Sequence, residues 1–493
     1  MNTNIGLVFE LVFLHYVLNL NTLFLLLNTS KNVKVVFETI SFKLKSHYFD
    51  DNNILKQVLK VLEKYTLSHF DLSYYEIGPE DAKKLMSALG QRTALTNLIF
   101  KWTKIGSVGV ESLPLVFNNL SLAFIDLTGN EIGPKGGEIL AGVLGQCKGL
   151  ARLDLSYNGL GPEGTTSIAG ALSQCFALAS LNLSGNEIGL EGAKSLAKVL
   201  NNLSLTCLNL TGNNIESKGA ENIIGAIGQC TGLTSLDLSC NEIQNLGFLR
   251  LRQYKNLAIK YLGFNGNGIE QSGAESLAGV LRQCPSLSHL DLTENQIGPE
   301  GAISLAGALG QCTALVRLDL STNGIEGESL ALVIGQCAAL TRLDLSFNEI
   351  NADGAASIAA VLPQCAALAY LNLGSNLLGP NGAASIAAVL PLCKALSVLD
   401  LCNTMIGPDG AASLAPVLPQ CKALTSINLC YTGIGPDGAA SLVVVLPECL
   451  ALREIDVSNN AMGEIMVNAL QALESKNFKL ICDGDEEVDI EFD

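Results

Sequence analysis

The sequence has few cationic side chains and few side chains of the kind that catalyse reactions. Its 493 residues contain 30 lysines and arginines against 47 acidic residues, so the formal net charge is -17. Because the phosphate backbone requires a basic face, nucleic acid is excluded as the main partner. The four histidines, His15, His47, His69 and His289, lie in no metal-binding or nucleophile motif. The sequence therefore predicts no enzyme, no metal site and no cofactor.

The cysteines lack the spacing of a metal site or a redox motif. Among the fifteen cysteines there is no CxxC pair and no cysteine–histidine spacing typical of zinc. Ten recur just past a predicted helix: Cys147, Cys175, Cys230, Cys284, Cys312, Cys337, Cys365, Cys393, Cys421 and Cys449. Such residues act as small apolar core residues, so this pattern indicates a reducing compartment. Cys402 and Cys430 differ because they lie on neighbouring predicted strands, where a redox or metal role is an alternative.

One long apolar stretch, residues 6–27, lies within an N-terminal segment that spans residues 1–32. It is long enough to cross a bilayer, but it contains Glu10 and His15 and no base precedes it. The alternatives are a signal or membrane anchor, a buried helix that caps the array, and a wrongly assigned start codon. A membrane partner or export is expected only if this segment is a real anchor or signal.

Residues 33–66 are expected to form an N-terminal cap, because a weak strand pattern is followed there by an amphipathic helix pattern. An array of stacked repeats needs such a cap over its apolar end. The last part of the chain, residues 476–493, ends in an acidic tail, in which residues 483–493 carry seven acids and no base.

The remainder, residues 67–475, is a repeat, which residues 340–367 show most clearly. LTRLDL alternates, so Leu343 and Leu345 lie on one side of a half-buried strand. Asn348 then ends the strand with an amide suited to bond turn backbone, and apolar residues follow at helical spacing until Pro363. One repeat is therefore a strand, a turn, a helix and a second turn.

The repeats can be counted by the residue that ends each strand. Fifteen such residues occur, mostly 28 residues apart: Tyr75, Thr103, Asn130, Asn158, Asn186, Asn213, Asn241, Asn267, Asn295, Asn323, Asn348, Asn376, Thr404, Thr432 and Asn460. Neither half of a repeat can bury its apolar side alone, but stacking lays strand beside strand and helix beside helix. The expected fold is an α/β solenoid of about 15 repeats, with parallel strands on the concave face and helices on the convex face.

The pattern LxxLDLSxNxIGxxGAxxLAxxLxxC, as at residues 150–175 and 287–312, resembles leucine-rich repeats of the ribonuclease-inhibitor type. These repeats are found also in NOD-like receptors and in the Ran GTPase-activating protein. The resemblance implies a curved horseshoe that binds protein partners. It also offers two alternatives, a regulator of a small GTPase and a NOD-like-receptor-type sensing or host-interaction protein. A whole NOD-like receptor is excluded, because the chain contains no receptor nucleotide-binding module.

Each predicted strand has two outward-facing positions. One carries an aspartate or asparagine in most repeats, including Asp319 and Asp344, and this ladder is interpreted as a solvated face. The other, two residues earlier, is variable and in consecutive repeats reads Tyr261, His289, Arg317, Arg342 and Tyr370; Glu294 and Phe347 lie nearby at strand ends. Tyrosine and arginine dominate interface energetics. The alternative is that the two arginines merely neutralise Asp319 and Asp344.

The expected function is therefore a non-enzymatic, cytoplasmic interaction protein. We expect a monomer that holds a protein partner on its concave face through Tyr261, His289, Glu294, Arg317, Arg342, Phe347 and Tyr370.

Overall fold

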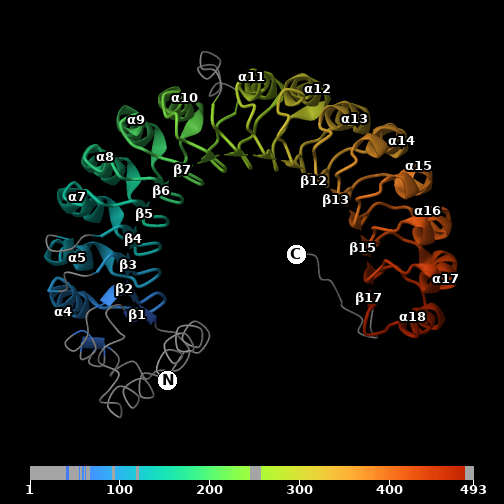
Figure 1. Cartoon of the computed structure of the whole chain (residues 1–493), viewed down its shortest axis with the longest axis horizontal. Coiled ribbons are helices and arrows are strands. Elements are labelled where there is room, and N and C mark those ends of the chain that lie inside the picture. The colour runs from blue at the N-terminus through green and yellow to red at the C-terminus, as the bar shows by residue number, and fades with distance from the viewer. Residues whose placement is uncertain are drawn as a thin grey trace, which may run out of the picture. The chain divides into compact units, whose positions relative to one another are not determined.

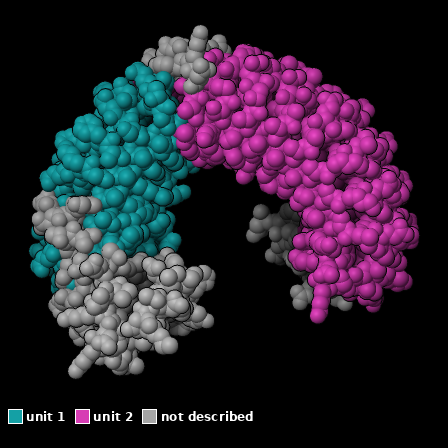
Figure 2. Space-filling model, viewed as in Figure 1, with its two compact units in different colours: residues 1–215, 225–233 teal, residues 216–224, 234–493 magenta. Residues whose placement is uncertain are grey.

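The computed structural model describes residues 40–43, 55, 58–59, 62, 67–91, 95–117, 122–244 and 257–482. The chain divides into two compact units, one of residues 1–215 and 225–233 and the other of residues 216–224 and 234–493 (Figure 2). The expectations for residues 1–32 and for the acidic tail lie outside the described residues. None of the helices that the structure describes is long and apolar enough to cross a membrane.

Unit 1 alternates strands with helices. Its elements are β1 (Ile40–Lys43), β2 (Leu67–Asp71), α4 (Pro79–Leu89), β3 (Asn97–Ile99), α5 (Gly106–Val110), α6 (Pro114–Phe117), β4 (Phe124–Asp126), α7 (Gly133–Leu144), β5 (Arg152–Asp154), α8 (Gly161–Leu172), β6 (Ser180–Asn182), α9 (Gly189–Leu200) and β7 (Cys207–Asn209). Helix α10 (Glu216–Ile227) has residues in both units. Each strand from β1 to β6 pairs in parallel with the strand that follows it.

Unit 2 continues the same alternation. Its elements are β8 (Ser235–Asp237), β9 (Tyr261–Gly263), α11 (Gln271–Leu281), β10 (His289–Asp291), α12 (Gly298–Leu309), β11 (Arg317–Asp319), α13 (Gly327–Gln336), β12 (Arg342–Asp344), α14 (Ala352–Val361), η3 (Leu362–Gln364), β13 (Tyr370–Asn372), α15 (Gly379–Val389), η4 (Leu390–Leu392), β14 (Val398–Asp400), α16 (Gly407–Leu414), η5 (Ala415–Gln420), β15 (Ser426–Asn428), α17 (Gly435–Val445), η6 (Leu446–Glu448), β16 (Glu454–Asp456), α18 (Glu464–Gln471) and β17 (Lys479–Ile481).

The strands of unit 2, β8 to β17, are likewise parallel and paired in chain order. Within each unit the strands lie along one side of the stack and the helices along the other (Figure 1). The predicted α/β repeat solenoid is confirmed, and the strands β2 to β16 correspond to the fifteen counted repeats. Strand β17 adds one further strand to the stack, beyond residue 475.

The core of each repeat lies between its strand and its helix. The central strand residue, Leu153 in β5 or Leu343 in β12, is buried, as are helix residues such as Ile358 and Ala359 in α14. Pro363 ends its helix as predicted: α14 stops at Val361 and a short 3-10 turn follows. The alternation read from LTRLDL is therefore the alternation of the strand itself.

The strand-ending asparagines form a buried ladder that ties each repeat to the next. The Asn348 side-chain amide donates to the carbonyl of Leu345 in its own repeat (3.1 Å) and to that of Leu320 in the preceding repeat (2.9 Å). Its carbonyl oxygen accepts from the backbone nitrogens of Asn323 (3.2 Å) and Ile325 (3.0 Å). The predicted bonding of turn backbone by these asparagines is thus confirmed.

Candidate protein-binding surface

The aspartates of the outward ladder are structural residues, which differs from the solvated face that we expected. One oxygen of Asp344 accepts from the backbone nitrogen (3.1 Å) and the hydroxyl (2.7 Å) of Ser346. Its other oxygen accepts from the Asn372 amide of the next repeat at 3.0 Å. An aspartate readily accepts hydrogen bonds from backbone groups two residues later. Asp344 is therefore half-buried, and both of its carboxylate oxygens have hydrogen-bond donors. The ladder therefore offers no free acid–base pair.

The variable outward position does bring the predicted residues together. In register, His289 pairs with Tyr261 and with Arg317, Arg317 pairs with Arg342, and Arg342 pairs with Tyr370. We call these five residues, Tyr261, His289, Arg317, Arg342 and Tyr370, the arginine row. All five lie in unit 2 on the outward face of β9 to β13. Neighbouring strands are about 4.8 Å apart, so the row is a continuous band of side chains.

The two tyrosines at the ends of the row are held in place by different partners. The Arg342 guanidinium lies over the Tyr370 ring, with its central carbon 3.5 Å from the ring centroid. The Tyr261 hydroxyl donates to Asp237 at 3.2 Å. Burial raises the pKa of both phenols above the ordinary value, and neighbouring aspartates raise it further. Both hydroxyls therefore stay protonated at neutral pH, and the Tyr261 proton is already donated to Asp237.

Arg317 and His289 form the exposed middle of the row. Both side chains are exposed, and the Ser288 hydroxyl lies 2.8 Å from the His289 ring nitrogen Nδ1. Within the described part of the chain, neither Arg317 nor Arg342 forms an ion pair, while Asp319 and Asp344 are bonded to serines. This geometry does not support the alternative in which the arginines serve to neutralise Asp319 and Asp344.

Glu294 and Phe347 belong to a second row, formed by the residue before each strand-ending residue. Both have positive φ angles, 54° and 53°, and both side chains are exposed. Phe347, 62 % exposed, lies in the repeat of Arg342, and Glu294 lies in the repeat of His289. We call this second row, which runs along one end of the strands, the ledge.

The ledge also carries aromatic residues in unit 1 that our sequence analysis missed. Tyr74, Trp102 and Tyr157 each precede a strand-ending residue and are 61 %, 46 % and 55 % exposed. The Trp102 and Tyr157 ring centroids lie 5.9 Å apart. The signal that would have found them is the repeat position itself, because all three occupy the position of Phe347.

The structure pairs Cys402 with Cys430 in a disulfide across β14 and β15. Thirteen other cysteines are free, including the ten that follow helices. Burial raises the pKa of Cys284 and Cys337 to about 12, so these thiols are protonated and unreactive at neutral pH. No group of metal-binding side chains occurs among the described residues. The alternative of a metal role for Cys402 and Cys430 therefore finds no ligands around them.

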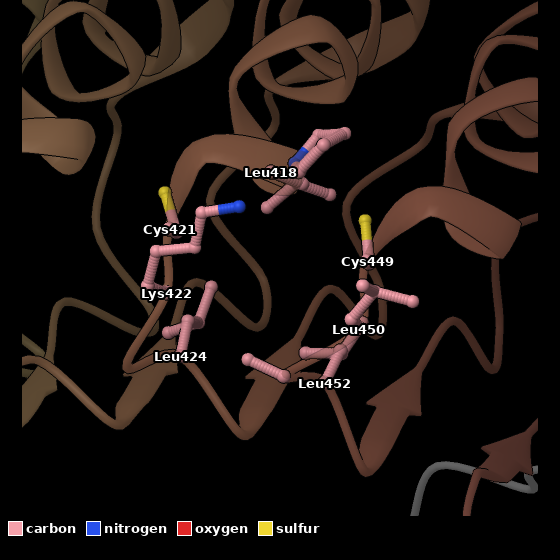
Figure 3. Close-up of a pocket in the computed structure, with 9 residues that line it drawn as sticks. Leu418, Cys421, Lys422, Leu424, Cys449, Leu450 and Leu452 are labelled. Atoms are coloured by element: carbon pink, nitrogen blue, oxygen red, sulfur yellow. The ribbon is translucent and has the colours of Figure 1, made fainter.

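A pocket lies between two successive repeats on the helical side of unit 2 (Figure 3). Four of its nine lining residues are leucines, and Cys421 and Cys449 lie at equivalent points of the two repeats. Burial raises the pKa of both thiols to about 11, so they are uncharged at neutral pH. Lys422 is then the one lining residue that carries a charge. The pocket therefore contains no acid–base pair or nucleophile.

Stacked strand–turn–helix repeats tied by a buried asparagine ladder define the class of protein. A profile of the family described as Leucine Rich repeat matches seven stretches, residues 118–141, 147–169, 174–197, 201–223, 229–249, 283–306 and 336–359. The chain is a leucine-rich repeat protein. This fold is typical of protein–protein interaction and is typically found in scaffolds without enzymatic activity.

Solved structures show distant likenesses to the chain. An internalin (inlF) from Listeria monocytogenes is 18% identical with a TM-score of 0.47, and the match covers 89% of this chain and 96% of that chain. A complex of Rad7 and Elc1 in yeast contains a chain 17% identical with a TM-score of 0.41, over 87% of this chain and 92% of that one. A PEPR1–AtPEP1 structure matches at 19% identity and a TM-score of 0.32, over 85% and 64%. Likenesses this weak carry no functional argument. No curated protein matches the chain.

Proposed function

We propose that the protein is a non-enzymatic interaction protein that holds a protein partner on the concave, strand-lined face of unit 2. The observation that supports this most is the arginine row. Its five side chains come from five consecutive strands, and its two arginines form no ion pair with any described residue. Arginine and tyrosine side chains of this kind are the usual hot spots of interfaces.

Glu294 and Phe347 extend the proposed contact onto the ledge. Phe347 is exposed beside the strand that carries Arg342, so an apolar group and a cation are available to the same partner. The positive φ of both residues is shared by this position throughout the array, so their exposed side chains, and not the backbone, support a role in binding. We therefore include both residues in the proposed site.

The finer classification is part of the same proposal. The 28-residue step and the full helices favour the ribonuclease-inhibitor type of repeat. Thirteen free cysteines, against the one disulfide of Cys402 and Cys430, favour the cytoplasm. We further propose that the protein is a monomer. Activation of a small GTPase and NOD-like-receptor-type sensing gain no specific support from the described residues.

The test compares a double variant of the row with a matched loss of charge elsewhere. Arg317→Ala with Arg342→Ala removes two cations from the row, while Lys394→Ala with Lys422→Ala removes two exposed cations from the helical side. Partners captured by the full-length protein are quantified by mass spectrometry, and the affinity of each is then measured with purified protein. We expect the arginine variant to bind its partner at least about tenfold more weakly, and the lysine variant to bind normally.

Melting curves of both variants serve as the folding control, because the arginines lie on the outward face and not in the core. A partner that binds the wild type and the arginine variant with equal affinity would show that the row is not the binding site.

A further inference from the structure

A second surface, in unit 1, has its own chemistry and lies outside the proposed partner site. It consists of Tyr74, Trp102 and Tyr157 on the ledge, with Glu131 and Glu187 beside them. These aromatic side chains are about half exposed although each is large and apolar. Exposed aromatic side chains gathered in one place mark sites of interaction more often than isolated ones do.

The backbone at these positions does not favour aromatic residues. Tyr74, Trp102 and Tyr157 have φ angles of 65°, 53° and 55°, in the left-handed region that bulky side chains avoid. At the same repeat position the chain elsewhere uses residues that adopt this region easily, such as Gly212 and Asn459. The turn itself therefore does not require an aromatic side chain at these positions.

Two of these rings lie over glycines of the following repeat. A Cβ atom on Gly129 would lie 2.3 Å from the Trp102 ring, and one on Gly185 would lie 2.6 Å from the Tyr157 ring. The glycine at Gly129 thus lets Trp102 lie flat between its own repeat and that of Tyr157, whose ring is tilted by 32° to it. The two rings and two glycines together form one continuous surface from Trp102 to Gly185, and Tyr74 holds the same position one repeat before Trp102.

Carboxylates flank this surface, whereas the nearby cations are already engaged. Glu131 and Glu187, each one residue past a strand-ending asparagine, are exposed and form no ion pair with a described residue. Lys101 lies 2.8 Å from the buried Asp126 carboxylate, and Lys104 pairs with Glu76. The field next to the open rings is therefore negative.

We propose that this aromatic and acidic ledge binds an extended, basic segment of a protein partner. Lysine and arginine side chains bind the faces of tryptophan and tyrosine rings, and carboxylates at the rim strengthen this attraction. From Tyr74 to Tyr157 the ledge crosses three strand spacings, roughly 14 Å, which an extended chain spans in four or five residues. Alternate residues of an extended chain face the same side, so the segment should carry a cation at every second position.

The test uses Trp102 as a reporter, because it is the one tryptophan in the 493 residues. The full-length protein is titrated with a peptide of alternating lysine and serine, and with matched peptides of glutamate and serine and of proline. We expect the lysine peptide to change the emission of Trp102 in a saturable way that weakens as salt is added, and the other two to leave it unchanged. Equal responses to all three peptides, or a response to the proline peptide alone, would overturn the proposal.

Variants locate the site on the ledge. Tyr157→Gly should lower the affinity for the lysine peptide about two- to fivefold. Glu131→Gln combined with Glu187→Gln should remove much of the salt dependence of this affinity. The matched control is Tyr431→Gly, since Tyr431 holds the same repeat position in unit 2 with a φ of 55° and is 48 % exposed.

Because glycine relieves the strained backbone, both tyrosine variants should keep or raise the melting temperature. A loss of binding in Tyr157→Gly therefore could not be attributed to unfolding. If Tyr431→Gly lowered the affinity for the peptide as much as Tyr157→Gly does, the binding site would not be the ledge of unit 1.

Discussion

At the scale of single residues, the strand-ending asparagine does more than any other side chain to define the repeat. Asn348 satisfies backbone groups of two repeats at once, and it is buried. Thr432 replaces it in one repeat, and its hydroxyl donates to the carbonyl of Leu429, the equivalent of the bond from Asn348 to Leu345. The threonine therefore makes some of the hydrogen bonds that the asparagine makes, as expected from its hydroxyl group.

Substitutions at this position should fall in a definite order. Asn348→Ala leaves buried backbone groups of both repeats without partners, at roughly 1–3 kcal/mol for each, so we expect a loss of at least about 2 kcal/mol in the free energy of unfolding. Asn348→Thr should lose less, because the hydroxyl restores the bond within its own repeat. Urea denaturation of the two variants measures the difference. Equal losses would mean that the bonds to the preceding repeat, which both variants lack, carry all of the stabilisation.

At the scale of elements, the strands and helix ends could be predicted from the periodic sequence pattern, whereas the backbone conformation of the turns could not. Leucines at alternate positions and Pro363 after the helix fixed the strand and the helix end, and the register then placed the arginine row correctly. Glu294 and Phe347 on the ledge were predicted, but Tyr74, Trp102 and Tyr157 were missed, because the positive φ that the ledge shares is a property of the turn. Residues as different as Thr322 and Phe347 share it, so the residue types alone give no signal.

The ladder and the disulfide were incompletely predicted for a related reason. Asp344 and Ser346 of the Asp–Leu–Ser pattern form a hydrogen bond from the serine hydroxyl to the carboxylate. The alternation of the strand indicates only that Asp344 faces outward. Cys402 and Cys430 were predicted on neighbouring strands, but the 4.7 Å between their Cα atoms, which permits a disulfide, does not follow from the sequence pattern. Distances between side chains depend on the local turn, which periodicity does not determine.

The cysteines that follow ten of the helices make the array sensitive to alkaline pH. Burial raises the pKa of Cys284 and Cys337 from the ordinary 9.0 to about 12. Between these values the unfolded chain loses these protons while the folded chain keeps them, so stability falls as pH rises. The contribution of these thiols to the free energy of unfolding should be fully present below about pH 9. Above that pH it should decrease by up to about 1.4 kcal/mol per pH unit for each such thiol.

Urea denaturation between pH 8 and pH 10.5 checks this, with Cys284→Ala and Cys337→Ala combined as the control. The double variant should be less stable at pH 8, because it leaves small cavities, but its stability should fall less steeply with pH. An identical slope in the two proteins would show that these thiols are not the groups that titrate.

At the scale of the whole molecule, stability is a sum of contacts between neighbouring repeats. In unit 2, β12 pairs with β11 and with β13, and α14 packs against α13 and α15. A repeat of this kind has no contact with repeats further along the stack, so a local defect should spread only through its neighbours.

Leu343→Ala tests this, because Leu343 is fully buried at the centre of β12. The cavity should cost about 2 to 5 kcal/mol. Hydrogen exchange should rise in β11 to β13 and in α13 and α14, while β16, four strands away, keeps the protection of the wild type. Arg342→Ala, one residue earlier on the outward face of the same strand, is the control and should leave exchange in the core helices unchanged. If protection fell equally in β16, unfolding of unit 2 would be all-or-none, and coupling between nearest neighbours alone would not describe it.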